Sequence, residues 1–161
     1  MLGEYPSTDV RVVPPEPGYC FAPWRQAYII DFRDTPTIAS IDASVRCKGE
    51  VLAANPTGIV VVNLVPGDLP LPSAEVREHA AAKQDEDLRG VLAHATIVLG
   101  QGFRAGTFRS MLTGLHLVSR SSLQRKVFSD AGSAALWLAK IIDAPRAWTT
   151  FSANRFRRRT C

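Results

Sequence analysis

The sequence predicts an α/β domain in which helices pack on a mixed, mostly parallel sheet of four to five strands, in the order β-β-α-β-α-β-α-β-α. Short apolar runs of strand length, the densest at residues 59–65, alternate along the chain with segments whose apolar residues recur every three or four positions. Turns rich in Pro and Gly separate these segments. Such strand-helix alternation after an opening hairpin favours parallel strands joined by crossover helices.

The first ordered elements are expected to form the hairpin. Residues 28–32 alternate weakly and indicate a strand, and residues 37–41 indicate its antiparallel partner across a short turn. Asp42 is then expected to cap a short helix that carries Val45 and Leu52 on its inner side.

The middle of the chain carries the clearest strand signal. Residues 59–65 are rich in β-branched residues, as in a central buried strand. The Pro-rich segment 66–72 cannot continue a helix or a sheet, and Ser73 is expected to cap a helix that runs to about residue 92. Residues 94–99 predict a further buried strand.

The last third repeats the strand-helix order twice. A tight turn at residues 100–102 leads into an apolar-striped helix over 104–118, and residues 124–128 predict a strand. Ser129 or Asp130 is expected to cap the final helix, whose apolar stripe is Ala134, Leu138, Ile141 and Ile142 and which Pro145 ends.

Length and composition predict one domain with two end segments. With 161 residues and 46% hydrophobic content, the chain can bury one core. We expect a Pro-rich extended segment at 1–25, the α/β domain at 26–145 and an Arg-rich tail at 146–161. The sequence contains neither an apolar window of about 18 residues nor a recognisable secretory signal, which favours a cytoplasmic protein.

The positive charge of the chain belongs to its tail. The net charge is +4, but residues 1–143 carry 14 basic and 15 acidic side chains. We therefore expect at most a weak contact with polyanions, made by the tail residues Arg155, Arg157, Arg158 and Arg159.

The element order over residues 28–143 resembles the STAS domain of bacterial anti-anti-sigma factors and of the cytoplasmic ends of sulfate transporters. The segments 100–104, 125–128 and 134–138 are similar to those of uncharacterised bacterial STAS-like proteins. The resemblance implies a non-enzymatic regulatory or protein-interaction module that binds another protein.

The switch loop of signalling STAS proteins, which follows the third strand, carries a serine or threonine that a partner kinase phosphorylates. The matching turn here contains Pro66, Gly67, Asp68 and Leu69, and the next hydroxyl belongs to Ser73. The resemblance therefore implies an interaction loop without the usual phosphorylatable serine. Ser73 can accept a phosphate, but its place before a helical stripe favours a capping role.

The turn at Gly100, Gln101 and Gly102 supports an alternative function. With Ala105 it matches Gly-x-Gly-x-x-Ala between a strand and a helix, the context of a dinucleotide-binding fingerprint. Only one strand and one helix follow, however, and Asp130 lies 28 residues beyond Gly102, whereas the fingerprint places its acid about 20 residues on. A simpler anion site at this turn would use Arg104, because Arg109 points elsewhere on the helix. The alternatives are a small-molecule or nucleotide-binding turn and a purely structural turn.

Apart from this turn, no pattern indicates catalysis, a metal or a cofactor. The three histidines, His79, His94 and His116, are widely spaced, and Cys20, Cys47 and Cys161 form neither a zinc motif nor a disulfide framework. The acidic run at 85–87 points in successive directions around a helix and is expected to face solvent. We therefore expect a protein without enzymatic activity, whose interaction loop shares one end of the sheet with the turn at 100–104.

Overall fold

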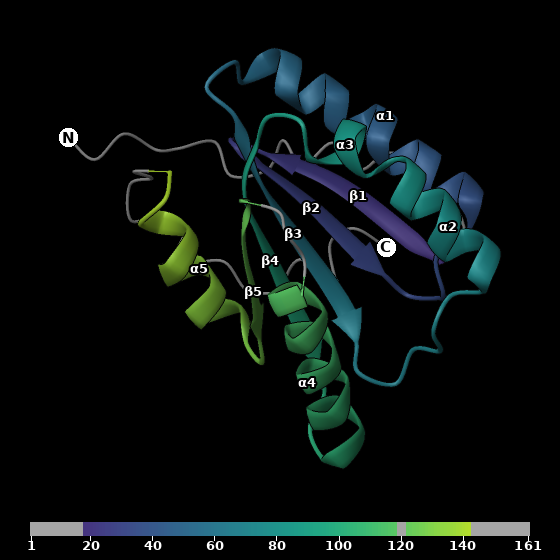
Figure 1. Cartoon of the computed structure of the whole chain (residues 1–161). Helices are drawn as coiled ribbons and strands as arrows, with labels where there is room; N and C mark the ends of the chain where they lie inside the picture. Colours follow the sequence, from purple (N-terminus) through teal and green to yellow (C-terminus); the bar gives the residue numbers. More distant parts are fainter. Residues whose placement is uncertain (1–17, 119–121, 143–161) are drawn as a thin grey trace.

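The computed structural model describes residues 18–118 and 122–142, and it shows one five-stranded sheet with helices packed on both faces (Figure 1). The elements, in chain order, are β1 (Tyr19–Trp24), β2 (Ala27–Phe32), α1 (Ile38–Ala54), β3 (Ile59–Pro66), α2 (Ala74–Ala82), α3 (Gln84–Leu88), β4 (Val91–Leu99), α4 (Phe103–Val118), β5 (Gln124–Phe128) and α5 (Ala131–Ala139).

The strands lie in the sheet in the order in which they occur in the sequence. β1 runs antiparallel to β2, and β2, β3, β4 and β5 are mutually parallel. One row of the register runs through Tyr28, Val61, His94 and Arg125. The predicted α/β class, the mixed sheet and the element order are confirmed.

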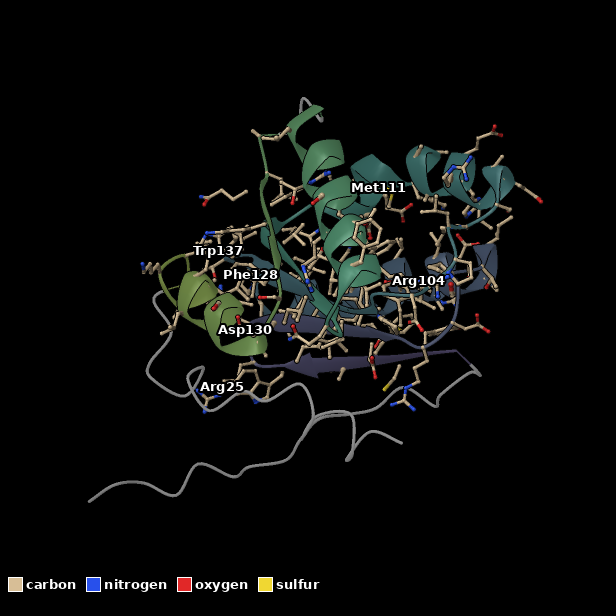
Figure 2. All side chains as sticks on the ribbon, turned by 90° about the horizontal axis from the view of Figure 1, so that it is seen from below. Arg25, Arg104, Met111, Phe128, Asp130 and Trp137 are labelled. Atoms are coloured by element: carbon tan, nitrogen blue, oxygen red, sulfur yellow. The ribbon has the colours of Figure 1, made fainter. Side chains whose placement is uncertain are left out.

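Two apolar clusters cover the two faces of the sheet. On one face, Val51 of α1 packs with Tyr28, Ile30 and Val61 of the sheet. On the other, Leu138 of α5 packs against the alternate residues of the strands. Figure 1 shows α1, α2 and α3 on one side of the sheet and α5 on the other. In Figure 2, β5 runs between α4 and α5, and both helices contact it.

β3 is the middle strand of the sheet and β4 lies beside it, both in the interior, as predicted. Val60, Val62 and Ile97 are almost completely buried, because both faces of these strands are covered. β-Branched side chains suit such positions, since they fill the pleated surface on either side.

The predicted hairpin partner at residues 37–41 is wrong. Thr37 Oγ1 accepts a hydrogen bond from Ser40 N at 3.1 Å, and Ser40 Oγ accepts one from Thr37 N at 2.8 Å. This reciprocal capping box starts α1 at Ile38, so Asp42 lies inside the helix and does not cap it.

The strand that pairs with β2 is β1, which lies within the expected extended segment at 1–25. Tyr19 opposes Phe32, and Trp24 opposes Ala27 across a tight turn. Arg25 in this turn has a φ of 54°, in the left-handed region. Phe21 of β1 is buried, so part of the Pro-rich segment belongs to the sheet.

The predicted long helix over 73–92 is interrupted. Ser73 caps its start as predicted, accepting from Val76 N at 3.3 Å. The helix divides at Lys83 into α2 and α3, and α3 ends at Leu88. Gly90 then adopts a φ of 72°, where an added Cβ would lie 2.6 Å from Leu52 Cδ2. The chain can turn into β4 there because this residue has no side chain.

The C-terminal elements agree with prediction except for the length of α5. Asp130 caps α5, accepting from Ser133 N at 2.7 Å, but the helix ends at Ala139 and does not reach residue 143. Neither Cys20 nor Cys47 forms a disulfide. Pro145, Cys161 and the Arg-rich tail lie outside the described residues, so the polyanion contact stays a prediction. None of the helices within residues 18–118 and 122–142 combines the length and apolar character that crossing a bilayer requires.

Candidate functional site

The loops that follow β3 and β4 meet at one edge of the sheet, as expected. Pro66 pairs with Leu99 in the register, and Gly67 N donates a hydrogen bond to Leu99 O at 2.9 Å. We call residues 66–71 and 100–104 the strand-end surface. It contains the predicted interaction loop, Pro66, Gly67, Asp68 and Leu69, and the predicted turn, Gly100, Gln101, Gly102 and Arg104.

Gly67 fixes the interaction loop against the start of α4. A Cβ at Gly67 would lie 2.7 Å from Ala105 Cβ and 2.8 Å from Leu99 O. Both atoms belong to well-packed elements, so the close approach is possible only without a side chain. The interaction loop therefore has a defined position relative to the turn.

The glycines of the turn serve its backbone conformation. Gly100 has a φ of 98° and Gly102 a φ of 92°, both in the left-handed region that favours glycine. A Cβ at Gly102 would meet nothing within 4 Å, so crowding does not require glycine there. The backbone geometry alone accounts for both residues of the fingerprint-like pattern.

The two arginines of α4 point to different surroundings, as expected. Arg109 Nη1 donates to Val98 O and to Gly100 O, each at 3.3 Å, and so fastens the end of β4 to α4. Arg104 is exposed at the start of α4 (Figure 2). Only Arg104 is placed to meet a ligand or partner at the strand-end surface.

Two large apolar side chains of the strand-end surface project into solvent. Phe103, the first residue of α4, is 88% exposed, and Leu71 is 58% exposed. The other large apolar side chains exposed within the described residues are Leu92, Leu117 and Leu136. At the start of α4 the strand-end surface therefore presents an exposed aromatic ring, Phe103, next to an exposed cation, Arg104.

A second polar site lies beneath α1, α2 and α3. It is a cavity of about 140 Å³ between these helices and the sheet. Lys48 of α1 lines it with a side chain only 3% exposed, and its Nζ donates to the backbone and side-chain oxygens of Asp87. Burial lowers the pKa of Lys48, and the neighbouring Asp87 opposes that change.

No residue of this cavity was among the predicted site residues. Its helix α1 was expected to bury Val45 and Leu52, yet Ser44 and Lys48 are the more buried residues. Of the acidic run 85–87, which was expected to face solvent, Glu86 is exposed, and Asp87 is partly exposed but also pairs with Lys48. The available signal was the spacing of Ser40, Ser44 and Lys48, which places them on one face of a helix.

The histidines that the structure describes lie apart. His79 Nε2 is 2.7 Å from Asp42 Oδ1, between α2 and α1, whereas His94 lines the cavity from β4. The side chain of His116 lies outside the described part. Within that part, no group of three or more potential ligands can hold a metal ion.

Comparison with known proteins gives no relative for this chain: no family model matches its sequence, and no characterised protein or solved structure is similar to it.

Proposed function

We propose that the chain is a STAS-like protein-interaction module of the regulatory kind, which binds another protein through the strand-end surface and catalyses no reaction. The observation that carries this proposal is the exposure of Phe103, 88%, at the start of α4 beside the interaction loop. The STAS-like assignment rests on the element order and on the opening antiparallel strand pair.

An exposed aromatic ring on a fixed helix end is well suited to protein contact. Aromatic residues and arginine are the side chains most enriched at the energetic centres of protein interfaces. Phe103 and Arg104 are adjacent, and the contacts of Gly67 with Leu99 and of Arg109 with Gly100 hold their surroundings in place. A partner would therefore bind a preformed surface and lose little conformational entropy.

The interaction loop offers no hydroxyl for a phosphate switch. Residues 66–72 contain neither serine nor threonine, and the Ser73 hydroxyl caps α2. We infer that partner binding at this loop depends on shape and on the exposed apolar side chains.

Affinity capture from extracts of the source cells, followed by mass spectrometry, tests the proposal. We compare the parent chain with Phe103→Ser and with Leu136→Ser, which removes a large exposed apolar side chain from α5, away from the strand-end surface. We expect one partner to be retained by the parent and by Leu136→Ser and to be lost with Phe103→Ser. Equal capture by all three chains would contradict the proposal.

The alternative is a nucleotide or small anion bound at Gly100, Gln101, Gly102 and Arg104. It draws on the exposed arginine at the start of the long helix α4. A thermal-shift measurement with NAD, NADP and ATP distinguishes it, because a saturable rise in melting temperature that Arg104→Ala abolishes requires a bound nucleotide.

A further inference from the structure

The cavity beneath α1, α2 and α3 is large enough for a small organic molecule. Its volume is about 140 Å³, and a protein cavity of about 150 Å³ holds a benzene molecule. The sheet forms its floor through β2, β3 and β4, and residues of α1, α2 and α3 form its roof.

Asn63 places an unsatisfied acceptor on the floor of the cavity. Asn63 Oδ1 is buried and has no hydrogen-bond partner among the described residues. Asn63 is the single polar residue within the apolar run of β3, and it sits between Ile30 and Thr96 in the register. A buried amide oxygen of this kind is normally satisfied by a donor, so a hydrogen-bond donor is expected in the cavity.

Lys48 places a donor on the opposite wall. Its ammonium group carries three protons, and the two described acceptors are the backbone and side-chain oxygens of Asp87. Lys48 is paired with Asp87, and the second lysine that lines the cavity, Lys83, is paired with Glu86 at 3.3 Å, so both cations already have a counter-charge. A charged ligand would bring an uncompensated charge into the cavity, so an uncharged ligand is favoured.

Apolar side chains complete the walls. Ile30, Phe32 and Val61 contribute from the sheet, and Ile41 and Ala80 from the helices. These apolar side chains and the polar residues Asn63 and Lys48 line the same cavity. α2 has no buried residue of its own, and the Asp87 side chain is 42% exposed, so the cavity reaches solvent beside these helices.

We propose that this cavity binds a small uncharged molecule, with an apolar body about the size of benzene and a neighbouring donor and acceptor, as in an aromatic carboxamide. The donor of the ligand would meet Asn63 Oδ1, and its acceptor would meet the Lys48 ammonium group. This site is separate from the strand-end surface, and the proposal does not depend on the proposed function.

Benzamide is the probe that tests this assignment on the full chain, with binding followed by calorimetry and by amide NMR shifts. Toluene, which lacks the polar group, and benzoate, which is charged, are the matched control compounds. We expect saturable binding of benzamide, with shifts around Asn63 and Lys48, and binding of both controls weaker by about tenfold or more.

Two variants separate specific binding from simple occupation of space. Asn63→Leu keeps the size of the side chain and removes the acceptor, so benzamide affinity should fall about tenfold while toluene affinity rises. Lys48→Met should also weaken benzamide binding and keep the fold. Leu136→Ser on α5 should leave binding unchanged. The proposal is overturned if benzamide shows no saturable binding to the parent, which would mean that the cavity holds only water, or if both cavity variants bind it as the parent does.

Discussion

His79 Nε2 lies 2.7 Å from Asp42 Oδ1, and this contact joins α2 to α1. α2 has no buried residue. Two polar contacts therefore help to attach α2 and its continuation α3 to α1. They are the contact of Asp42 with His79 and the ion pair of Lys48 with Asp87. Exposed contacts of this kind add little to global stability, but they determine how often a weakly packed element opens.

We predict that Asp42→Asn loosens α2 without unfolding the domain. Amide hydrogen exchange in residues 74–82 should become faster, while exchange in β3 and the melting temperature should stay close to the parent values. The matched control is Glu50→Gln, an exposed acid on the same helix. If the two variants exchanged alike in α2, the contact with His79 would not hold this helix.

The same contact predicts a dependence on acid. The hydrogen bond from His79 lowers the pKa of Asp42 below its ordinary value of 3.8. Because the folded-state pKa is the lower one, the stabilisation is complete above pH 3.8 and is lost as pH falls through the lowered value. The amide exchange rates in α2 of the parent should therefore approach those of Asp42→Asn only when the pH falls below 3.8. If the two chains already had the same exchange rates in α2 near neutral pH, the Asp42 carboxylate would not be the group that holds this helix.

Tyr28 predicts a dependence on alkali. Burial raises the pKa of Tyr28 above its ordinary value of 10.0, and its hydroxyl donates to Ser44 O at 3.1 Å. The stabilisation from the neutral phenol is complete below pH 10 and decreases above it, by up to about 1.4 kcal/mol per pH unit. Urea unfolding should show a weaker decline above pH 10 for Tyr28→Phe than for the parent. At neutral pH the free energy of unfolding of Tyr28→Phe should be lower than that of the parent by about 1 kcal/mol, because a buried hydrogen bond is lost. Tyr19→Phe is the control.

The ion pair of Lys48 and Asp87 predicts opposite effects for its two partners. Lys48→Met should keep or raise the free energy of unfolding, because a buried ammonium group is replaced by an apolar side chain of similar length. Asp87→Ala should lower it by about 1–3 kcal/mol, since the buried Lys48 loses a charged partner that is itself partly exposed. A Lys48→Met chain clearly less stable than the parent would contradict this and show that the pair is a net stabiliser. Urea denaturation at neutral pH decides between these results.

Gly67 predicts a strict size limit where the interaction loop meets α4. Gly67→Ala would place a Cβ 2.7 Å from Ala105 Cβ, so we expect a loss of about 1–3 kcal/mol. Gly49→Ala is the matched control, because nothing lies within 4 Å of a Cβ there. Because Gly49 lies in the middle of α1, Gly49→Ala should raise the free energy of unfolding by about 0.5–1 kcal/mol. Calorimetric melting measures the stability of both variants. If Gly67→Ala were as stable as Gly49→Ala, the close packing of the interaction loop would be contradicted.

Local sequence patterns were sufficient for most of the sheet and insufficient for its first strand. β3 and β4 were predictable because both are dense apolar runs of strand length. β1 was hidden by Pro23 and by the prolines that precede the strand. Pro23 is tolerated because β1 is an edge strand, where one side of the backbone needs no ladder hydrogen bond. Residues 37–41 resembled a strand by their Thr and Ile content, but the capping pair Thr37 and Ser40 starts a helix there.

Of the two candidate sites, only the strand-end surface could be predicted from the sequence. The strand-end surface could be located because the ends of adjacent parallel strands share an edge whatever the side chains do. The cavity could not, because Lys48, Asn63 and Asp87 come from α1, β3 and α3 and meet only through tertiary packing. A lysine within a helix is expected to be exposed to solvent, because lysines are almost never buried unless they are paired.

The sheet order β1-β2-β3-β4-β5 has a consequence for biosynthesis. Each strand pairs with the strand made just before it, so no strand waits for a distant part of the chain. Contacts between sequence neighbours close short loops and favour rapid folding. As the chain leaves the ribosome, each new strand can add to an edge that is already formed. A nascent chain whose released part ends within α4 would therefore display β1 to β4 already paired, with the edge of β4 open for β5.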